Sequence, residues 1–174
     1  MKVAHMTQFY LCLLALVLAV KSAVAAEPSL YRQAEARTLT AEEATMFGPQ
    51  AGKYRYDSRM IRAAAIAQSR ANPHSTSKCW RYVKTALLAA GAVDSYPKTA
   101  YAKEAAQELP HDFGFRRLWC RDPYRAPIGS VLVYGGRDAG HVEIKTIHGY
   151  ASDFVSPTPY EKRPLIGIFV KPKA

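Results

Sequence analysis

The spacing of apolar residues changes from helical in the first part of the chain to strand-like in the second. The alanine-rich residues 58–71 and residues 78–90 both place apolar side chains on one face of a helix, and Ser77 is a suitable N-cap for the second. A shorter helix is predicted over residues 101–109, where Pro110 would end it. The first part is therefore expected to supply the helices of the fold.

The second part contains short segments rich in Val, Ile, Tyr and Phe and separated by glycines, a composition typical of strands and tight turns. Because short consecutive strands joined by glycine turns pair as neighbours, we expect a mostly antiparallel meander. Helices followed by strands predict an α+β fold, with N-terminal helices packed on a small antiparallel sheet. The expected strands are residues 128–134, 141–147, 150–155 and 165–170.

Residues 1–25 have the features of a secretory signal peptide. Lys2 precedes an apolar run over residues 9–20, and small residues at positions 23–25 are typical of a cleavage site. The run is too short to span a bilayer, which needs about 20 residues. We therefore expect an exported protein, periplasmic or secreted, that is not embedded in a membrane.

The remainder of the chain is expected to form one domain preceded by an arm. Residues 26–57 carry scattered charges with Pro and Gly and are predicted to be an arm or linker, whereas residues 58–174 can build a single core without disulfides or a metal. The chain has 24 Lys and Arg against 14 Asp and Glu, a formal net charge of +10. This excess favours an acidic partner, such as cell-wall polymer, nucleic acid or an anionic membrane surface, without selecting among them.

Cys79 lies near the start of the second predicted helix, where unpaired backbone N–H groups and the helix dipole favour an anion. A thiolate there would be a nucleophile, and the same N–H groups could hold the oxyanion of an acyl-transfer reaction. An exported protein also allows a structural disulfide between Cys79 and Cys120. An inert thiol is the third interpretation.

His141 begins a predicted strand in which His141 and Glu143 alternate with apolar residues, so the histidine lies on a polar face. A general base for Cys79 needs a further group that holds its other ring nitrogen. Asp153, on the next predicted strand, is our candidate for that group, and Glu143 and His148 are alternatives. Otherwise His141 is a surface histidine at a turn and Asp153 a solvated charge at a strand end.

Four segments, taken in order, carry a family resemblance. They are residues 77–83 (SKCWRYV), 127–134 (PIGSVLVY), 140–144 (GHVEI) and 150–154 (YASDF). Their order resembles the NlpC-type and CHAP cysteine peptidases and amidases of bacterial cell walls. The resemblance implies a compact papain-like domain that cleaves amide bonds in the peptide stems of peptidoglycan. By position it implies Cys79 as nucleophile, His141 as general base and Asp153 as the third member.

A basic, aromatic segment, residues 113–125, precedes the strands and contains Arg117 and Trp119. It is interpreted either as a loop that covers the sheet and exposes its arginines, or as a wall of the substrate groove that meets acidic stem peptides. Trp80 has helical spacing to Val83 and Leu87, so it is either a core residue or a substrate contact. Under the groove interpretation, Trp80, Arg117 and Trp119 bind substrate.

No histidine has zinc-ligand spacing with Cys79 or Cys120, so we expect neither a metal site nor another cofactor. The glycine-rich residues 135–140 lie between two predicted strands and not before a helix. They are therefore expected to form a hairpin loop and not a phosphate site.

One leading hypothesis and two competing ones follow from these patterns. The leading one is an exported cysteine hydrolase of peptidoglycan that uses Cys79, His141 and Asp153 and has no nucleic-acid partner. The first alternative is a non-enzymatic, exported cell-wall-binding module in which Cys79 and Cys120 form a disulfide. The second is a basic secreted nuclease that uses His141, Glu143 and Lys145. It agrees with the charge but does not explain Cys79.

Overall fold

The computed structural model describes residues 57–173, so the predicted signal peptide and all of the predicted arm except Asp57 lie outside the described residues. The described part contains helices first and a sheet afterwards, which confirms the α+β prediction. The helices are α4 (Ser58–Ser69), α5 (Cys79–Ala89) and α6 (Ala105–Phe113), with the short 3-10 helices η2 (Ala102–Glu104) and η3 (Pro123–Arg125). The strands are β1 (Arg116–Arg117), β2 (Val131–Tyr134), β3 (His141–Thr146), β4 (Gly149–Ala151), β5 (Val155–Ser156) and β6 (Leu165–Val170).

The first two helices begin and end close to the predicted positions. The side chain of Asp57 caps α4, because its Oδ1 accepts the backbone N–H of Arg59 at 3.0 Å. Gly91 follows α5 with a φ of 70°, the left-handed conformation that a glycine adopts without steric cost. Local capping chemistry therefore sets these helix boundaries.

Pro110 does not end the third helix, contrary to the prediction. α6 continues through Pro110 to Phe113 and ends at Gly114, which has a φ of 69°. Proline removes one backbone donor, but its fixed φ is compatible with a helix, whereas a left-handed residue terminates one. The glycine is therefore the stop signal in this segment.

All strand pairs of the sheet are antiparallel, in the order β1-β6-β2-β3-β4-β5. The run from β2 to β5 is the predicted meander, and β6 returns to pair with the other side of β2. The predicted strand 150–155 is divided into β4 and β5 by a bend at residues 152 and 153. β1 was not predicted, since two residues are too few for a recognisable alternation.

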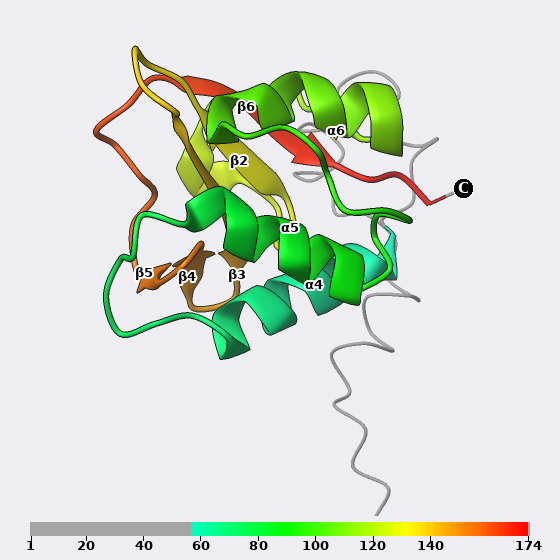
Figure 1. Ribbon diagram of the computed structural model, residues 1–174, viewed down its shortest axis with the longest axis horizontal. Coiled ribbons are helices and arrows are strands. Elements are labelled where there is room, and N and C mark those ends of the chain that lie inside the picture. The colour runs from blue at the N-terminus through cyan, green and yellow to red at the C-terminus, as the bar shows by residue number, and fades with distance from the viewer. Residues whose placement is uncertain (1–56, 174) are drawn as a thin grey trace, which may run out of the picture. The chain divides into compact units, whose positions relative to one another are not determined.

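The three helices pack on one face of the sheet, as Figure 1 shows, with α4 and α5 against β3 and α6 against β6. Val133, Val142 and Ile144 point into this core, and burying such a side chain contributes about 1.5–3 kcal/mol. The opposite face carries a second apolar cluster, to which the basic, aromatic segment contributes Leu118 and the partly buried Cys120. That segment therefore covers the sheet, as one of its two interpretations expected.

Candidate active site

Cys79 is the first residue of α5, so it lies at a helix N-terminus as expected. Its side chain is half-buried. The expected N-cap is wrong, however. Lys78 occupies the cap position without a side-chain hydrogen bond, and Ser77 has a φ of 60°. Ser77 is the one non-glycine residue with a positive φ within residues 57–173. The turn into α5 is thus held by a group from elsewhere in the chain.

That group is Asp153, whose side chain is 0% exposed. Its Oδ2 accepts the backbone N–H groups of Thr76 at 2.5 Å and Lys78 at 3.2 Å. The hydroxyls of Thr76 and Ser75 also donate to Oδ2, at 3.0 and 3.3 Å. Burial acts to raise the pKa of Asp153, but the N–H and O–H donors outweigh it and lower that pKa below its ordinary value. Asp153 is therefore a carboxylate that caps the turn before α5.

His141 is the first residue of β3 and is 8% exposed. Gly140 precedes it with a φ of 80°, and a Cβ there would lie 2.5 Å from the carbonyl oxygen of Tyr134, so only glycine fits. Burial lowers the pKa of His141, but hydrogen bonds to Cys79 and Glu143 and their charges outweigh burial and raise it to about 9. The side-chain hydrogen bond between Cys79 and His141 places the thiol beside the imidazole.

Glu143 is the carboxylate that approaches His141, with Oε2 3.4 Å from Nε2. Its other oxygen, Oε1, accepts the Tyr134 hydroxyl at 2.7 Å and the Tyr160 backbone N–H at 3.2 Å. Burial and the neighbouring charge of Glu143 raise the pKa of Tyr134, so this hydroxyl stays protonated and donates.

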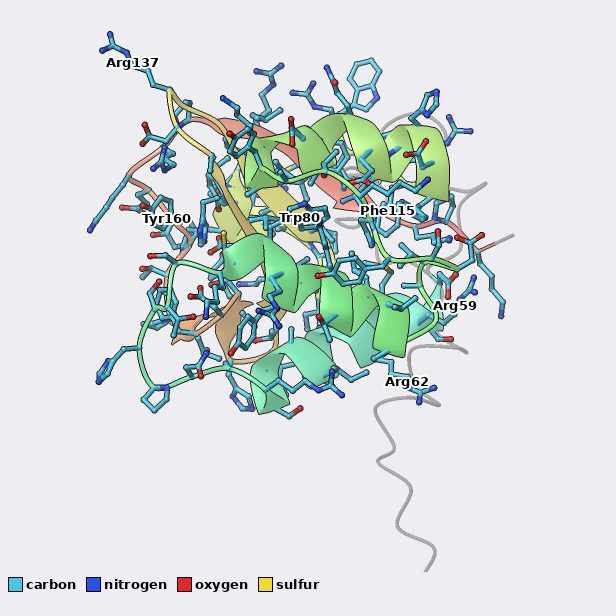
Figure 2. All side chains as sticks on the ribbon, viewed as in Figure 1. Arg59, Arg62, Trp80, Phe115, Arg137 and Tyr160 are labelled. Carbon is cyan, nitrogen blue, oxygen red and sulfur yellow. The ribbon has the colours of Figure 1, made fainter. Side chains whose placement is uncertain are left out.

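The ring of Tyr160 completes the surroundings of the imidazole. It stacks on His141 with ring centroids 4.2 Å apart and an interplanar angle of 29°. In Figure 2, Tyr160 lies on the same side of the domain as the N-terminal end of α5. His141 is consequently held between a carboxylate at one ring nitrogen and an aromatic ring on its face.

The structure brings Cys79 and His141 together but places Asp153 elsewhere than expected. The register pairs Ile144 with Ala151, so Asp153, two residues further on, returns to the helix-packed face that Ile144 shares. No contact joins Asp153 to His141 among the described residues. Glu143 shares a face with His141 on the same strand, a relation that the alternation of β3 already contained. The other alternative, His148, is exposed at the turn after β3.

The three predicted substrate contacts have different environments. Trp80 is 4% exposed, and its indole N–H donates to Thr99, so it is a core residue with little surface for a substrate (Figure 2). Trp119 is 77% exposed, and the exposed Arg117 donates to the carbonyl of Ile166. No hydrogen bond, ion pair or ring contact joins Arg117 or Trp119 to the Cys79–His141 pair in the described part of the chain. Their role as substrate contacts stays a prediction.

Cys79 and Cys120 are both free thiols. The disulfide on which the binding-module alternative depended is thus not formed between these two residues. Within residues 57–173, no helix is long and apolar enough to cross a membrane. In the same range, no group of three or more His, Cys, Asp or Glu residues is placed to hold a metal ion.

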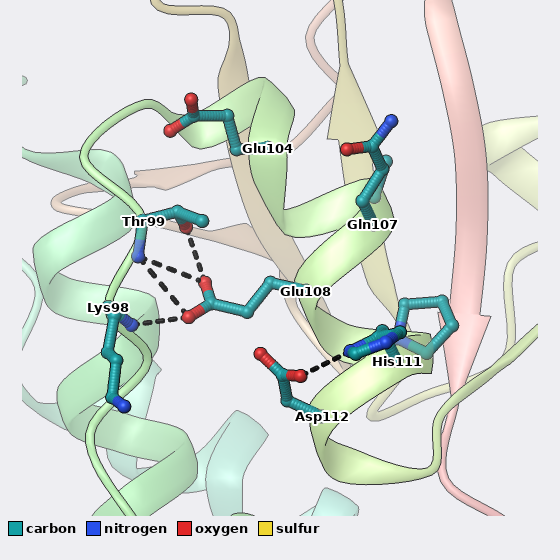
Figure 3. A pocket seen from close by; sticks show the side chains of 9 residues that line it. Lys98, Thr99, Glu104, Gln107, Glu108, His111 and Asp112 are labelled. Atoms are coloured by element: carbon teal, nitrogen blue, oxygen red, sulfur yellow. Dashed lines mark hydrogen bonds and ion pairs between the residues drawn. The ribbon is translucent and has the colours of Figure 1, made fainter.

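A pocket beside α6 lies outside this constellation. Figure 3 shows that Glu108, one of its lining residues, points toward Lys98 and Thr99. The carboxylate of Glu108 accepts the backbone N–H groups of both residues and the Thr99 hydroxyl. It is therefore occupied in holding the segment before η2.

No family model matches the chain, and no curated protein matches it. Two crystal structures of the type VI effector–immunity complex Tae3–Tai3 from Ralstonia pickettii are similar to it. The native structure is 26% identical with a TM-score of 0.52, and the match covers 66% of this chain and 98% of that chain. The selenomethionine structure is 25% identical with a TM-score of 0.50, covering 63% and 98%. The likeness confirms the predicted papain-like arrangement of helices on an antiparallel sheet.

Proposed function

We propose that this chain is an exported cysteine hydrolase that cleaves amide bonds in the peptide stems of peptidoglycan. The observation that carries the proposal is the contact between Cys79, at a helix N-terminus, and the buried His141, which Glu143 approaches from the same strand. The fold likeness supports the papain-like framework. The resemblance of the motif order to cell-wall peptidases supports the substrate.

Cys79 is the proposed nucleophile. Its Sγ attacks the carbonyl carbon of the scissile amide and forms a tetrahedral oxyanion, which collapses to a thioester as the C–N bond breaks. The N–H groups of Cys79 and Trp80 lie in the first turn of α5, where no helical carbonyl precedes them to accept. We assign these two N–H groups to the oxyanion, because the N–H of Lys78 is already bonded to Asp153.

His141 is the proposed proton carrier. As an imidazolium it donates its proton to the leaving amine, and as a neutral base it then takes a proton from the water that hydrolyses the thioester. Since Glu143 approaches Nε2, Nδ1 is the nitrogen left for Cys79. We therefore propose Glu143, in place of Asp153, as the third member of the triad.

Two observations bear on the setting in which the enzyme acts. The sequence pattern of residues 1–25 favours export to the compartment that contains peptidoglycan. The likeness to an effector–immunity complex favours use as an effector that a separate immunity protein binds. Both settings require the same chemistry at Cys79.

The proposal is tested by digesting purified peptidoglycan with the protein lacking residues 1–25. Cys79→Ala should lower muropeptide release by several orders of magnitude while leaving the melting temperature close to that of the wild type. Cys120→Ala is the matched control, because it also removes a half-buried free thiol but should retain release. Mass analysis of the new termini identifies the bond. Wild-type release by Cys79→Ala would disprove the proposal.

A further inference from the structure

The loop before Cys79, residues 75–78, is held in a strained conformation by one buried carboxylate. Ser77 has a φ of 60°, and the residues on either side of it, Thr76 and Lys78, both donate their backbone N–H groups to Oδ2 of Asp153. We propose that Asp153 is a positioning residue, which holds this loop so that Cys79 stays in contact with His141. The inference rests on the proposed role of Cys79 as the nucleophile.

A left-handed conformation at a serine needs such a restraint. For an L-residue other than glycine it is disfavoured by about tenfold, and it persists where the surroundings impose it. Asp153 restrains the longer segment of residues 72–78 at both of its ends. Its backbone carbonyl accepts the N–H and the side-chain amide of Asn72, both at 2.8 Å. Its carboxylate then holds the other end of the segment at Lys78.

The same contacts determine which amides remain for a substrate. The N–H groups of Thr76 and Lys78 are bonded to Asp153, and that of Ser77 donates to the hydroxyl of Ser75 at 3.3 Å. Counted from Thr76 onward, Cys79 is the first residue whose N–H meets no acceptor within residues 57–173. Asp153 thus acts on the nucleophile side of the site, while Glu143 acts on the histidine.

The reactivity of Cys79 toward iodoacetamide in the native protein tests this inference without any peptidoglycan. The alkylation rate of Cys79 is read against that of Cys120 in the same molecule by peptide mass mapping. Asp153→Ala should lower the relative rate by about tenfold, the factor by which the left-handed conformation is disfavoured. Asp153→Asn should lower it less, because the amide oxygen still accepts the loop N–H groups.

Variants at Ser77 separate loop strain from general destabilisation. Glycine adopts the left-handed conformation freely, so Ser77→Gly should restore part of the lost reactivity in the Asp153→Ala background. Ser77→Ala, which removes the same hydroxyl but keeps the strain, should not. A wild-type rate in Asp153→Ala, or equal rescue by both Ser77 variants, would overturn the proposal. If Asp153→Ala does not fold, Asp153→Asn decides, because a wild-type rate there overturns the proposal equally.

A titration distinguishes this role from membership of the triad. In a Cys79→Ala background, the pKa of His141 measured by NMR should fall more with Glu143→Gln than with Asp153→Asn. An equal or larger fall with Asp153→Asn would mean that Asp153 acts on the histidine, and the inference would be lost. Because neither readout uses a substrate, failure of the wild type to digest peptidoglycan would refute the proposed substrate and leave this inference standing.

Discussion

Glu143 and Asp153 are both buried carboxylates at the same site, but the groups around them differ in kind. Glu143 faces the ring of His141 and a tyrosine hydroxyl, whereas Asp153 faces the backbone N–H groups of the loop before Cys79. The first carboxylate can influence where a proton resides on an imidazole. The second is bonded to backbone and hydroxyl groups of the loop before Cys79, so its proposed action is on the position of that loop. The donors around a buried carboxylate therefore indicate its role better than burial does.

Replacing Glu143 should have the largest effect on activity, and it tests whether Glu143 acts on His141. In Glu143→Gln the charge that helps to raise the pKa of His141 is lost, so this pKa should fall and the alkaline limb of the activity profile should move to lower pH. We expect kcat to fall by about 10²-fold or more, because proton transfer through His141 is then poorly matched to the reaction. Hydrolysis rates measured from pH 5 to about pH 10 test both expectations.

Glu108→Gln is the matched control for that variant. Glu108 is also a buried carboxylate that accepts backbone N–H groups, but it lies beside α6 and has no contact with His141 among the described residues. Its replacement should lower stability and leave the alkaline limb in place. If Glu143→Gln and Glu108→Gln gave the same profile, Glu143 would have no special relation to His141.

Removing the Tyr134 hydroxyl should have an intermediate effect. Tyr134→Phe keeps the ring but takes a donor from buried Glu143 Oε1, which costs about 1–3 kcal/mol of unfolding free energy. Because Glu143 then holds His141 less firmly, we expect kcat to fall by about tenfold, equivalent to 1.4 kcal/mol. Tyr150→Phe, whose hydroxyl donates to the Pro123 carbonyl on the same face, should lose stability but retain activity. Equal kcat values in the two variants would contradict this role of Tyr134.

The smallest expected effect is on the free energy of unfolding. The contributions of His141 and Asp153 to it should change in different pH ranges. The pKa of His141 is raised from 6.5 to about 9, so its contribution is fully present below pH 6.5 and is lost as the pH rises toward 9. The pKa of Asp153 is lowered below 3.8, so its contribution is present above pH 3.8 and is lost below it.

Urea unfolding across this pH range measures both contributions. His141→Gln should flatten the alkaline decline in unfolding free energy and leave the acid decline, and Asp153→Asn should do the reverse. The wild type supplies the reference curve for both variants. A single variant that removed both declines would show that the ionisation of His141 and that of Asp153 are coupled.

Most of the fold was predictable because it follows from short-range patterns. The helices α4 and α5 and the strands β3 and β6 lie where the apolar periodicity predicts them. The errors occur where a local signal was weak or ambiguous. Pro110 was taken as a stop although a proline can remain inside a helix, and β1 is too short to have a period.

The sequence by itself determined that a cysteine begins a helix and that a histidine and a glutamate share one face of a strand. These relations depend on residues a few positions apart, and the helical and strand periods set them directly. Which carboxylate meets His141 was decided only by the tertiary structure. It depends on the register of β3 with β4 and on the bend after Ala151, which together turn Asp153 toward the loop before Cys79. Because side chains alternate along a strand, one residue of register decides whether a carboxylate lies beside the imidazole or on the opposite face of the sheet.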